Sequence, residues 1–168
     1  MNTASWTSAF LLLGSNMGNR LRLLESACSL LQQPCICVEK KSSVYESAPW
    51  GFEAAQNFLN MALQVRTQLC PHSLLQAAQR VEQELGRERA AGAGYASRPI
   101  DVDILFYGGD VVDDAPQLSV PHPRVHERRF ALAPLAEIAP DFVHPVLKKT
   151  VATLLRECGD TGSVARLG

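Results

Sequence analysis

Two carboxylates separated by one residue interrupt an apolar segment of this 168-residue chain. Asp101 and Asp103 lie within residues 100–106, where Ile, Val, Leu and Phe favour a β-strand. Side chains alternate between the two faces of a strand, so both carboxylates share one face, about 7 Å apart at their α-carbons. Two like charges at that distance repel by roughly 2 kcal/mol at an effective dielectric constant near 20. The pair therefore predicts a bound cation. Carboxylate oxygens favour Mg²⁺, which commonly accompanies phosphates.

The alternative to a metal site is a solvated strand face on which each Asp is an ordinary surface charge. The apolar neighbours of the pair argue against this alternative, and so do nearby arginines. Arg87, Arg89 and Arg98 are candidate phosphate clamps, because a guanidinium offers fixed donors that match phosphate oxygens. Glycines at 92 and 94 would let this segment close over a ligand. A solvated basic loop is the alternative interpretation of the segment.

Apolar segments and helical periodicities alternate along the chain in the order β-α-β-β-α-β. Strands are expected at 10–13, 36–44, 58–67 and 100–107, and helices at 23–31 and at about 71–85. This order predicts an α+β fold with a ferredoxin-like core, in which helices cover the faces of an antiparallel sheet.

The last third of the chain is expected to be a C-terminal extension of the same domain. Short helical segments are predicted at 128–138 and 150–156, and residues 159–168 are expected to form a loose tail. Glycines at 108 and 109 predict a turn that leads into a hairpin strand at 111–112. At 168 residues, the whole chain 1–168 is predicted to be a single domain.

Aromatic residues and one amide could form a slot for a flat heterocycle. Trp50, Phe58 and Phe130 offer faces that stack on a ring, and the Asn60 amide can both donate and accept hydrogen bonds along its edge. Ordinary core packing is the alternative for the two Phe residues. It explains Trp50 less well, because Trp50 lies beside Pro and Gly in an expected loop at 47–56.

Three further features are compatible with ligand binding and with ordinary structure. The Gly-Ser-Asn sequence at 14–16 is expected where a strand ends, either as a plain turn or with its N–H groups on a polar ligand. Gln79 and Glu82 share a helix face, which either contacts a nucleotide or is a solvated flank. His122 lies between two prolines that stiffen it, either as a phosphate contact or as a structural His.

Composition narrows the classes of partner. The net charge of −1 gives no electrostatic reason to expect nucleic acid or an anionic membrane. Five irregularly spaced Cys predict free thiols, as in cytoplasmic proteins, and Cys35 and Cys37 lack a second pair for zinc. The apolar segment 9–13 is too short for a signal sequence or a membrane span. We therefore expect a cytoplasmic protein that has no membrane or nucleic-acid partner.

With these residues assembled, the chain resembles the 6-hydroxymethyl-7,8-dihydropterin pyrophosphokinase family of folate biosynthesis. The Arg-Pro-Ile-Asp-Val-Asp-Ile sequence at 98–104 is highly specific to that family, whereas Gly-Ser-Asn alone is not. The matching segments span nearly the whole chain in family order, at 13–16, 43–51, 58–60, 79–89, 98–104, 120–122 and 128–135.

The resemblance implies transfer of the terminal diphosphate of ATP to the pterin hydroxymethyl group, with release of AMP. It implies two Mg²⁺ ions on Asp101 and Asp103, which are catalytic positions together with Arg87 and Arg89. The implied pterin-binding positions are Ser47, Ala48, Trp50, Phe58, Asn60, Tyr95 and Phe130. The implied ATP-binding positions are Gln79, Glu82, Arg98, Ile104, Ser119, His122 and Arg128.

The chain departs from the family pattern at a few positions. Tyr95 stands where the family often has Trp, Phe58 replaces a Tyr, and Gln117 stands where a nucleotide-contacting Arg can occur. Two rival interpretations are a different Mg²⁺-dependent transferase on the same fold and a ferredoxin-like RNA-binding module. The second would need paired aromatics on a basic sheet face, which the predicted strands lack. We expect a monomer that acts on ATP and the pterin.

Overall fold

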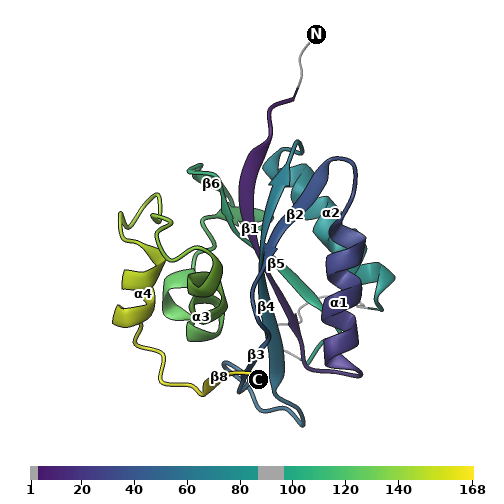
Figure 1. The fold of residues 1–168 in the computed structure, drawn as a ribbon, viewed down its shortest axis with the longest axis vertical. Helices are drawn as coiled ribbons and strands as arrows, with labels where there is room; N and C mark the ends of the chain where they lie inside the picture. Colours follow the sequence, from purple (N-terminus) through teal and green to yellow (C-terminus); the bar gives the residue numbers. More distant parts are fainter. Residues whose placement is uncertain (1–3, 87–96) are drawn as a thin grey trace.

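The computed structural model describes residues 4–86 and 97–168. In these residues, one sheet lies between two layers of helices, with α1 and α2 on one face and α3 and α4 on the other (Figure 1). The strands of this sheet are β1 (Thr7–Ser15), β2 (Ile36–Lys41), β3 (Tyr45–Ser47), β4 (Phe58–Thr67), β5 (Asp101–Tyr107) and β8 (Val164–Arg166). The helices are α1 (Arg20–Leu31), α2 (Pro71–Glu84), α3 (Arg129–Ile138) and α4 (Val151–Glu157).

The sheet has the topology that the sequence predicts. Its strand order is β5-β1-β4-β3-β8, β2 also pairs with β4, and every pairing is antiparallel. The core β1-α1-β2/β3-β4-α2-β5 is therefore ferredoxin-like, and the prediction of an α+β fold is confirmed. Helix α2 begins and ends close to its predicted bounds, because Pro71 starts it and Gly86, with a φ of 95°, follows its end. Helix α1 begins at Arg20, earlier than predicted.

Strand β1 separates two hydrophobic cores. Leu11 and Leu13 pack on the side of α1 and α2, whereas Phe10 and Leu12 pack on the side of α3. Both faces of β1 are therefore buried, which explains why its sequence is continuously apolar rather than alternating.

The strand predicted at 36–44 ends early, at Lys41, and a separate strand begins just beyond the predicted range. The pairing of β2 with β4 shifts register between Val38 and Lys40, and the strand ends at Lys41. Buried Ser42 then takes up both polar groups of Ala62: its hydroxyl accepts from the Ala62 N–H, and its own N–H donates to the Ala62 carbonyl, each at 2.9 Å. Strand β3 resumes the pairing at Tyr45 and extends through Ser47, which the sequence placed in a loop.

Two predictions about the later part of the chain are wrong: the position of the hairpin strand and the loose tail. The strand after the glycine turn does not return along β5, because β6 (Val112–Asp114) pairs with β7 (Leu118–Val120) in a separate hairpin. The last ten residues are not a loose tail either. They include β8, which pairs along β3, so the chain ends on an edge of the main sheet.

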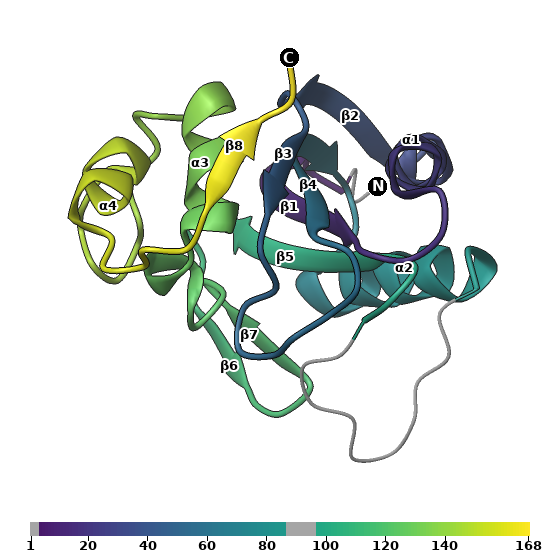
Figure 2. The same ribbon diagram turned by 90° about the horizontal axis from the view of Figure 1, so that it is seen from below.

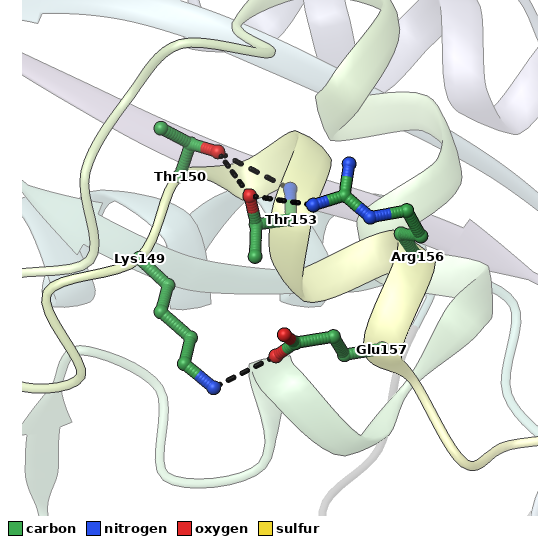
Figure 3. A network of polar contacts seen from close by, with 5 residues as sticks. All are labelled: Lys149, Thr150, Thr153, Arg156 and Glu157. Atoms are coloured by element: carbon green, nitrogen blue, oxygen red, sulfur yellow. Dashed lines mark hydrogen bonds and ion pairs between the residues drawn. The ribbon is translucent and has the colours of Figure 1, made fainter.

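Helix α4 belongs to the second helical layer and carries its own polar network (Figure 3). The Thr150 hydroxyl caps its N-terminus by accepting from the Thr153 N–H at 3.2 Å, and Lys149 Nζ lies 2.7 Å from Glu157 Oε2. None of the helices in the described part of the chain is both long and apolar enough to span a membrane. All five Cys are free thiols, as the sequence predicts.

Candidate active site

Asp101 and Asp103 occupy one face of β5, as their spacing predicts. Asp101 pairs with Gly14 and Asp103 pairs with Leu12 on the neighbouring strand β1. The residue between them, Val102, points into the core beneath α1 and α2. Because pairing partners in an antiparallel sheet project to the same side, Gly14 and Leu12 share the face of the two carboxylates. This face looks toward α3 rather than toward α2.

The ionisation of Asp103 is strongly perturbed in this site. Burial raises the pKa of Asp103 well above its ordinary value, and the charge of Asp101 and a hydrogen bond with it raise this pKa further. The Arg128 guanidinium opposes that rise, and Glu82 adds to it. Arg98 Nη1 lies 3.4 Å from Asp101 Oδ1. Taken together, these described neighbours disfavour the charged form of Asp103. This is expected of a cation site before the cation binds.

Buried Glu82, on α2, supports β5 from the face opposite the two aspartates. Its Oε1 accepts a hydrogen bond at 2.9 Å from the N–H of Val102, and its side chain is buried against β5. The structure therefore answers the question that the helix spacing left open. Glu82 does not lie on a solvated flank, because its carboxylate is buried and accepts from the backbone N–H of Val102, the residue between the two aspartates.

Asn16 holds the segment that carries Arg98. The Asn16 Oδ1 accepts from the Arg98 N–H at 2.8 Å, its N–H donates to the Arg98 carbonyl at 3.3 Å, and its Nδ2 donates to Ser97 Oγ at 3.0 Å. These contacts join the end of β1 to the start of β5. This role could not be predicted beyond the polar character of residues 14–16, because the partners lie more than 80 positions away along the chain.

A second part of the site comes from β3 and β4. Asn60 is buried, and its Nδ2 donates to Ser47 Oγ at 2.8 Å. Asn60 pairs with Gly14 across β1 and β4, so its side chain lies on the carboxylate face of the sheet. A Cβ added at Gly14 would come within 3.3 Å of Asn60 Oδ1 and 3.6 Å of the Phe58 ring. The glycine therefore allows close approach within the sheet, and it lies inside β1 rather than in a turn.

Trp50 forms a wall with two arginines. The guanidinium of Arg128 lies 4.9 Å from the centre of the Trp50 ring and 5.6 Å from that of Phe130, and Arg124 lies 5.5 Å from the Trp50 ring. Aromatic faces and guanidinium planes thus alternate along this side of the site. The flat groups favour a planar ligand between them.

His122 stays neutral beside these arginines. Burial and the charges of Arg128 and Arg124 lower its pKa to about 4, although Asp101 acts in the opposite direction. The ring Nδ1 of His122 accepts from the backbone N–H of Arg124 at 3.1 Å. The backbone N–H of His122 donates to the Leu105 carbonyl at 2.9 Å. With Nδ1 used as an acceptor, the ring presents Nε2 as a donor.

These side chains surround one cavity of about 330 Å³, a size typical of small-molecule sites. Eleven of the residues predicted from the sequence line it: Ser47, Ala48, Trp50, Phe58, Asn60, Arg98, Asp101, Asp103, His122, Arg128 and Phe130. Gly14, from the Gly-Ser-Asn sequence at 14–16, also lines it, whereas the sequence missed two further lining residues: Leu12 and Phe52. Apolar periodicity assigned Leu12 to a buried strand but could not show which face carries the cavity.

Other predicted site residues lie elsewhere. Gln79 is half-buried on α2, Ile104 packs in the core on the far face of β5, and Ser119 pairs with Asp113 in the β6–β7 hairpin. These three residues and Glu82 do not line the cavity. Arg87, Arg89 and Tyr95 lie outside the described residues.

The donor set of the cavity fits Mg²⁺ that is shared with a substrate. Among the described residues, no group of three or more His, Cys, Asp or Glu is arranged to hold a metal. Two carboxylates on one strand face supply only part of an octahedral shell, so phosphate oxygens and water would complete it. The rise in the Asp103 pKa is the observation that supports this fit, because a cation would remove its cause.

The fold and the cavity define an α+β protein with a small-molecule site that combines an acidic pair, arginines and aromatic faces. A family model described as 7,8-dihydro-6-hydroxymethylpterin-pyrophosphokinase (HPPK) matches residues 10–140. The chain therefore belongs to the HPPK family.

Individual relatives agree with this assignment. The 2-amino-4-hydroxy-6-hydroxymethyldihydropteridine pyrophosphokinase of Bacillus subtilis (strain 168) is 47% identical over 131 residues, which cover 77% of this chain and 77% of the relative. The protein of the same description from Aquifex aeolicus (strain VF5) is 42% identical over 142 residues, which cover 84% of this chain and 86% of the relative.

Solved structures share the fold. A crystal structure of wild-type Plasmodium falciparum HPPK-DHPS matches with a TM-score of 0.72 at 16% sequence identity. The match covers 94% of this chain but 45% of the other, so this chain spans about half the length of that protein. At such low identity, the likeness concerns the fold alone.

Proposed function

We propose that this chain is an enzyme that transfers the diphosphate of ATP to the hydroxymethyl group of 6-hydroxymethyl-7,8-dihydropterin and releases AMP, a step of folate biosynthesis. Its place in the HPPK family supports this activity. The observation that carries the proposal is the placement of Asp101, Asp103 and Asn60 on one sheet face, around one cavity. A pair of carboxylates that can bind a cation and an amide that can bind a heterocycle thereby face the same space.

The pterin is assigned to the side of the cavity formed by β3, β4 and α3. The Asn60 amide is held by Ser47 and would hydrogen-bond to the edge of the ring, while Phe58 and Phe130 would stack on it. Ala48 and Trp50 complete this side, and Tyr95 is assigned to it from the resemblance. An ordered amide gives orientation as well as affinity, because it fixes which edge of the heterocycle enters first.

ATP is assigned to the side of the cavity formed by β5 and residues 120–128. Arg98, Arg128 and His122 line the cavity there, and all three can donate to phosphate oxygens. Gln79, Glu82, Ile104 and Ser119 stay assigned to the nucleotide from the resemblance. Arg87 and Arg89 are assigned to the stabilisation of charge on the transferring group.

The proposed reaction needs in-line displacement at the β-phosphorus. The pterin hydroxyl oxygen forms a bond to that phosphorus, the bond from it to the α,β-bridging oxygen breaks, the hydroxyl proton is lost, and AMP leaves with the bridging oxygen. Asp101 and Asp103 would hold two Mg²⁺ ions, which supply charge neutralisation and lower the pKa of the acceptor hydroxyl. The contribution of the protein is then to position both substrates and to keep the site dry.

The test is identification of both products. The protein is incubated with ATP and the hydroxymethyl pterin, with MgCl₂ or with EDTA, and nucleotides and pterins are separated by chromatography. We expect AMP and the pterin diphosphate in equal amounts with MgCl₂, and neither with EDTA. ADP or free pyrophosphate as the nucleotide-derived product would instead indicate a different transferase. Turnover that continues in EDTA would contradict the metal role of the acidic pair.

The chain is also proposed to act as a cytoplasmic monomer. The free thiols of all five Cys are compatible with a reducing compartment. Sedimentation at micromolar concentration, with and without substrates, tests the oligomeric state. A stable dimer under both conditions would contradict this part of the proposal.

A further inference from the structure

A C-terminal segment outside the family match lies against the pterin side of the cavity. We name residues 160–166 the C-terminal strap. The family model ends at residue 140, so the match does not include this segment. Figure 2 shows β8 alongside β3, with α3 next to it. The strap thus runs between β3 and α3, two of the elements that carry predicted pterin contacts.

The strap holds the first turn of α3 through Asp160. Asp160 Oδ2 accepts from the Arg129 N–H at 3.1 Å, and the Asp160 carbonyl accepts from Arg129 Nε at 3.0 Å. Helix α3 has no side-chain cap from its own N-cap residue, so Asp160 serves as a cap from a distant part of the chain. A carboxylate is favourable there, because the N-terminus of a helix carries partial positive charge. Arg129 lies between Arg128 and Phe130, both of which line the cavity.

The same strap holds β3, on which two other cavity residues lie. Val164 pairs with Ser47, and the Ser163 carbonyl accepts from the Ala48 N–H at 3.3 Å. Strand β3 has only three residues, and its other edge is paired with β4. The strap therefore supplies the second set of backbone partners for the strand that bears Ser47, the hydrogen-bond partner of Asn60.

Arg166 and Glu137 close the connection between the two elements. Arg166 Nη2 lies 3.6 Å from Glu137 Oε1 on α3. The Glu137 carboxylate also accepts from the Ser43 N–H at 2.6 Å and from the Ser43 hydroxyl at 2.7 Å, just before β3. The strap, α3 and the approach to β3 are thus joined at both ends of the strap.

We infer that the C-terminal strap positions the pterin subsite, with Asp160 as the positioning residue that fixes Phe130 relative to Ser47. This inference rests on the proposed function. The strap contacts β3 and α3, which carry Ser47 and Phe130 of the predicted pterin contacts, whereas β5, which bears the acidic pair, lies at the opposite end of the strand order β5-β1-β4-β3-β8. A weakened strap therefore changes recognition of the pterin more than recognition of ATP.

The test compares three variants of the full chain. Asp160→Ala removes the carboxylate, Asp160→Asn keeps an acceptor oxygen, and Thr150→Ala removes the cap of α4, a helix whose residues do not line the cavity (Figure 3). We expect Asp160→Ala to raise the KM for the pterin by about tenfold, with the KM for ATP and kcat changed by less than about threefold. Asp160→Asn restores most of the loss. Thr150→Ala lowers the unfolding midpoint without a change in either KM.

A second readout does not depend on activity. Amide hydrogen exchange in Asp160→Ala should become faster in residues 45–48 and 128–131 together, whereas Thr150→Ala should affect only the region of α4. Unchanged exchange in these two segments, or equal increases of the pterin KM in Asp160→Ala and Thr150→Ala, would overturn the inference. If the wild-type protein makes no AMP, the proposed function fails, and the exchange experiment still decides whether the strap holds the two elements.

Discussion

The carboxylate of Glu82 accepts a hydrogen bond at 2.9 Å from the N–H of Val102, the residue that separates Asp101 from Asp103. Glu82 extends from α2, which packs against β5. The helix therefore fixes the stretch of strand that carries the acidic pair, although it contributes no side chain to the cavity lining.

Replacement of Glu82 should lower the free energy of unfolding, because it removes this support of the strand. Glu82→Ala leaves the Val102 N–H buried without an acceptor, which costs about 1–3 kcal/mol of unfolding free energy in addition to the lost packing. Glu82→Gln keeps an acceptor oxygen and should cost less than about half as much. Urea unfolding of the three proteins measures the difference. Equal losses in the two variants would show that the hydrogen bond does not stabilise the strand.

We expect Asp103 to lower the stability of the folded protein while being required for turnover. Its folded pKa lies above the ordinary value of 3.8, so the folded state disfavours the charged carboxylate, and this cost appears as pH rises above about 4. Asp103→Asn should therefore raise the unfolding midpoint in EDTA at pH 7–8, with the gain shrinking as pH falls toward 4. The same variant should lose about a hundredfold or more of the turnover with MgCl₂ and ATP, because a metal ligand is removed.

Thermal unfolding at several pH values, in EDTA, tests the stability part of this prediction. A matched control is Asp113→Asn, which makes the same substitution in the β6–β7 hairpin, at an exposed residue that does not line the cavity. A lower midpoint for Asp103→Asn at pH 8 would contradict the assignment of the carboxylate repulsion to this pair.

His122 should contribute a pH dependence of the opposite sign. Its folded pKa of about 4 lies below the ordinary value of 6.5, so the unfolded chain binds a proton first. Stability from this group is fully present above pH 6.5 and is lost as pH falls toward 4, by about 2 kcal/mol for a half-buried imidazole. His122→Asn should remove that part of the slope. The difference between wild type and variant isolates it, because Asp103 and His144 contribute in both proteins.

Much of the fold could be predicted from the sequence, since each strand or helix of the core has a clear apolar period. The common face of Asp101 and Asp103 followed from the two-residue period alone. The pairing of β8 could not be predicted, because Val164–Arg166 is short and has only one half-buried residue. The edge of β3 selects it through backbone groups, which carry no sequence signal.

The candidate site shows the same division. Residue chemistry identified the lining residues at Asp101, Asp103 and Asn60, and the structure brings them together. The supporting contacts could not be predicted from the sequence, because Asn16 and Glu82 hydrogen-bond to backbone groups of segments far along the chain. A polar residue of that kind reads as surface until its distant partner is known.

Gly14 should be the most sensitive small residue of the site. It lies on β1 between Asn60 and Asp101, and a Cβ there would come within 3.3 Å of Asn60 Oδ1. Gly14→Ala should move the Asn60 amide by a few tenths of an ångström and raise the pterin KM by about tenfold, because the amide must match the ring edge. A β-strand tolerates Ala, so the unfolding free energy should change by less than about 1 kcal/mol. Gly109→Ala, where a Cβ meets nothing within 4 Å, is the matched control for the loss of a glycine. A pterin KM that stays at the wild-type value in Gly14→Ala would show that Asn60 is not held by this contact.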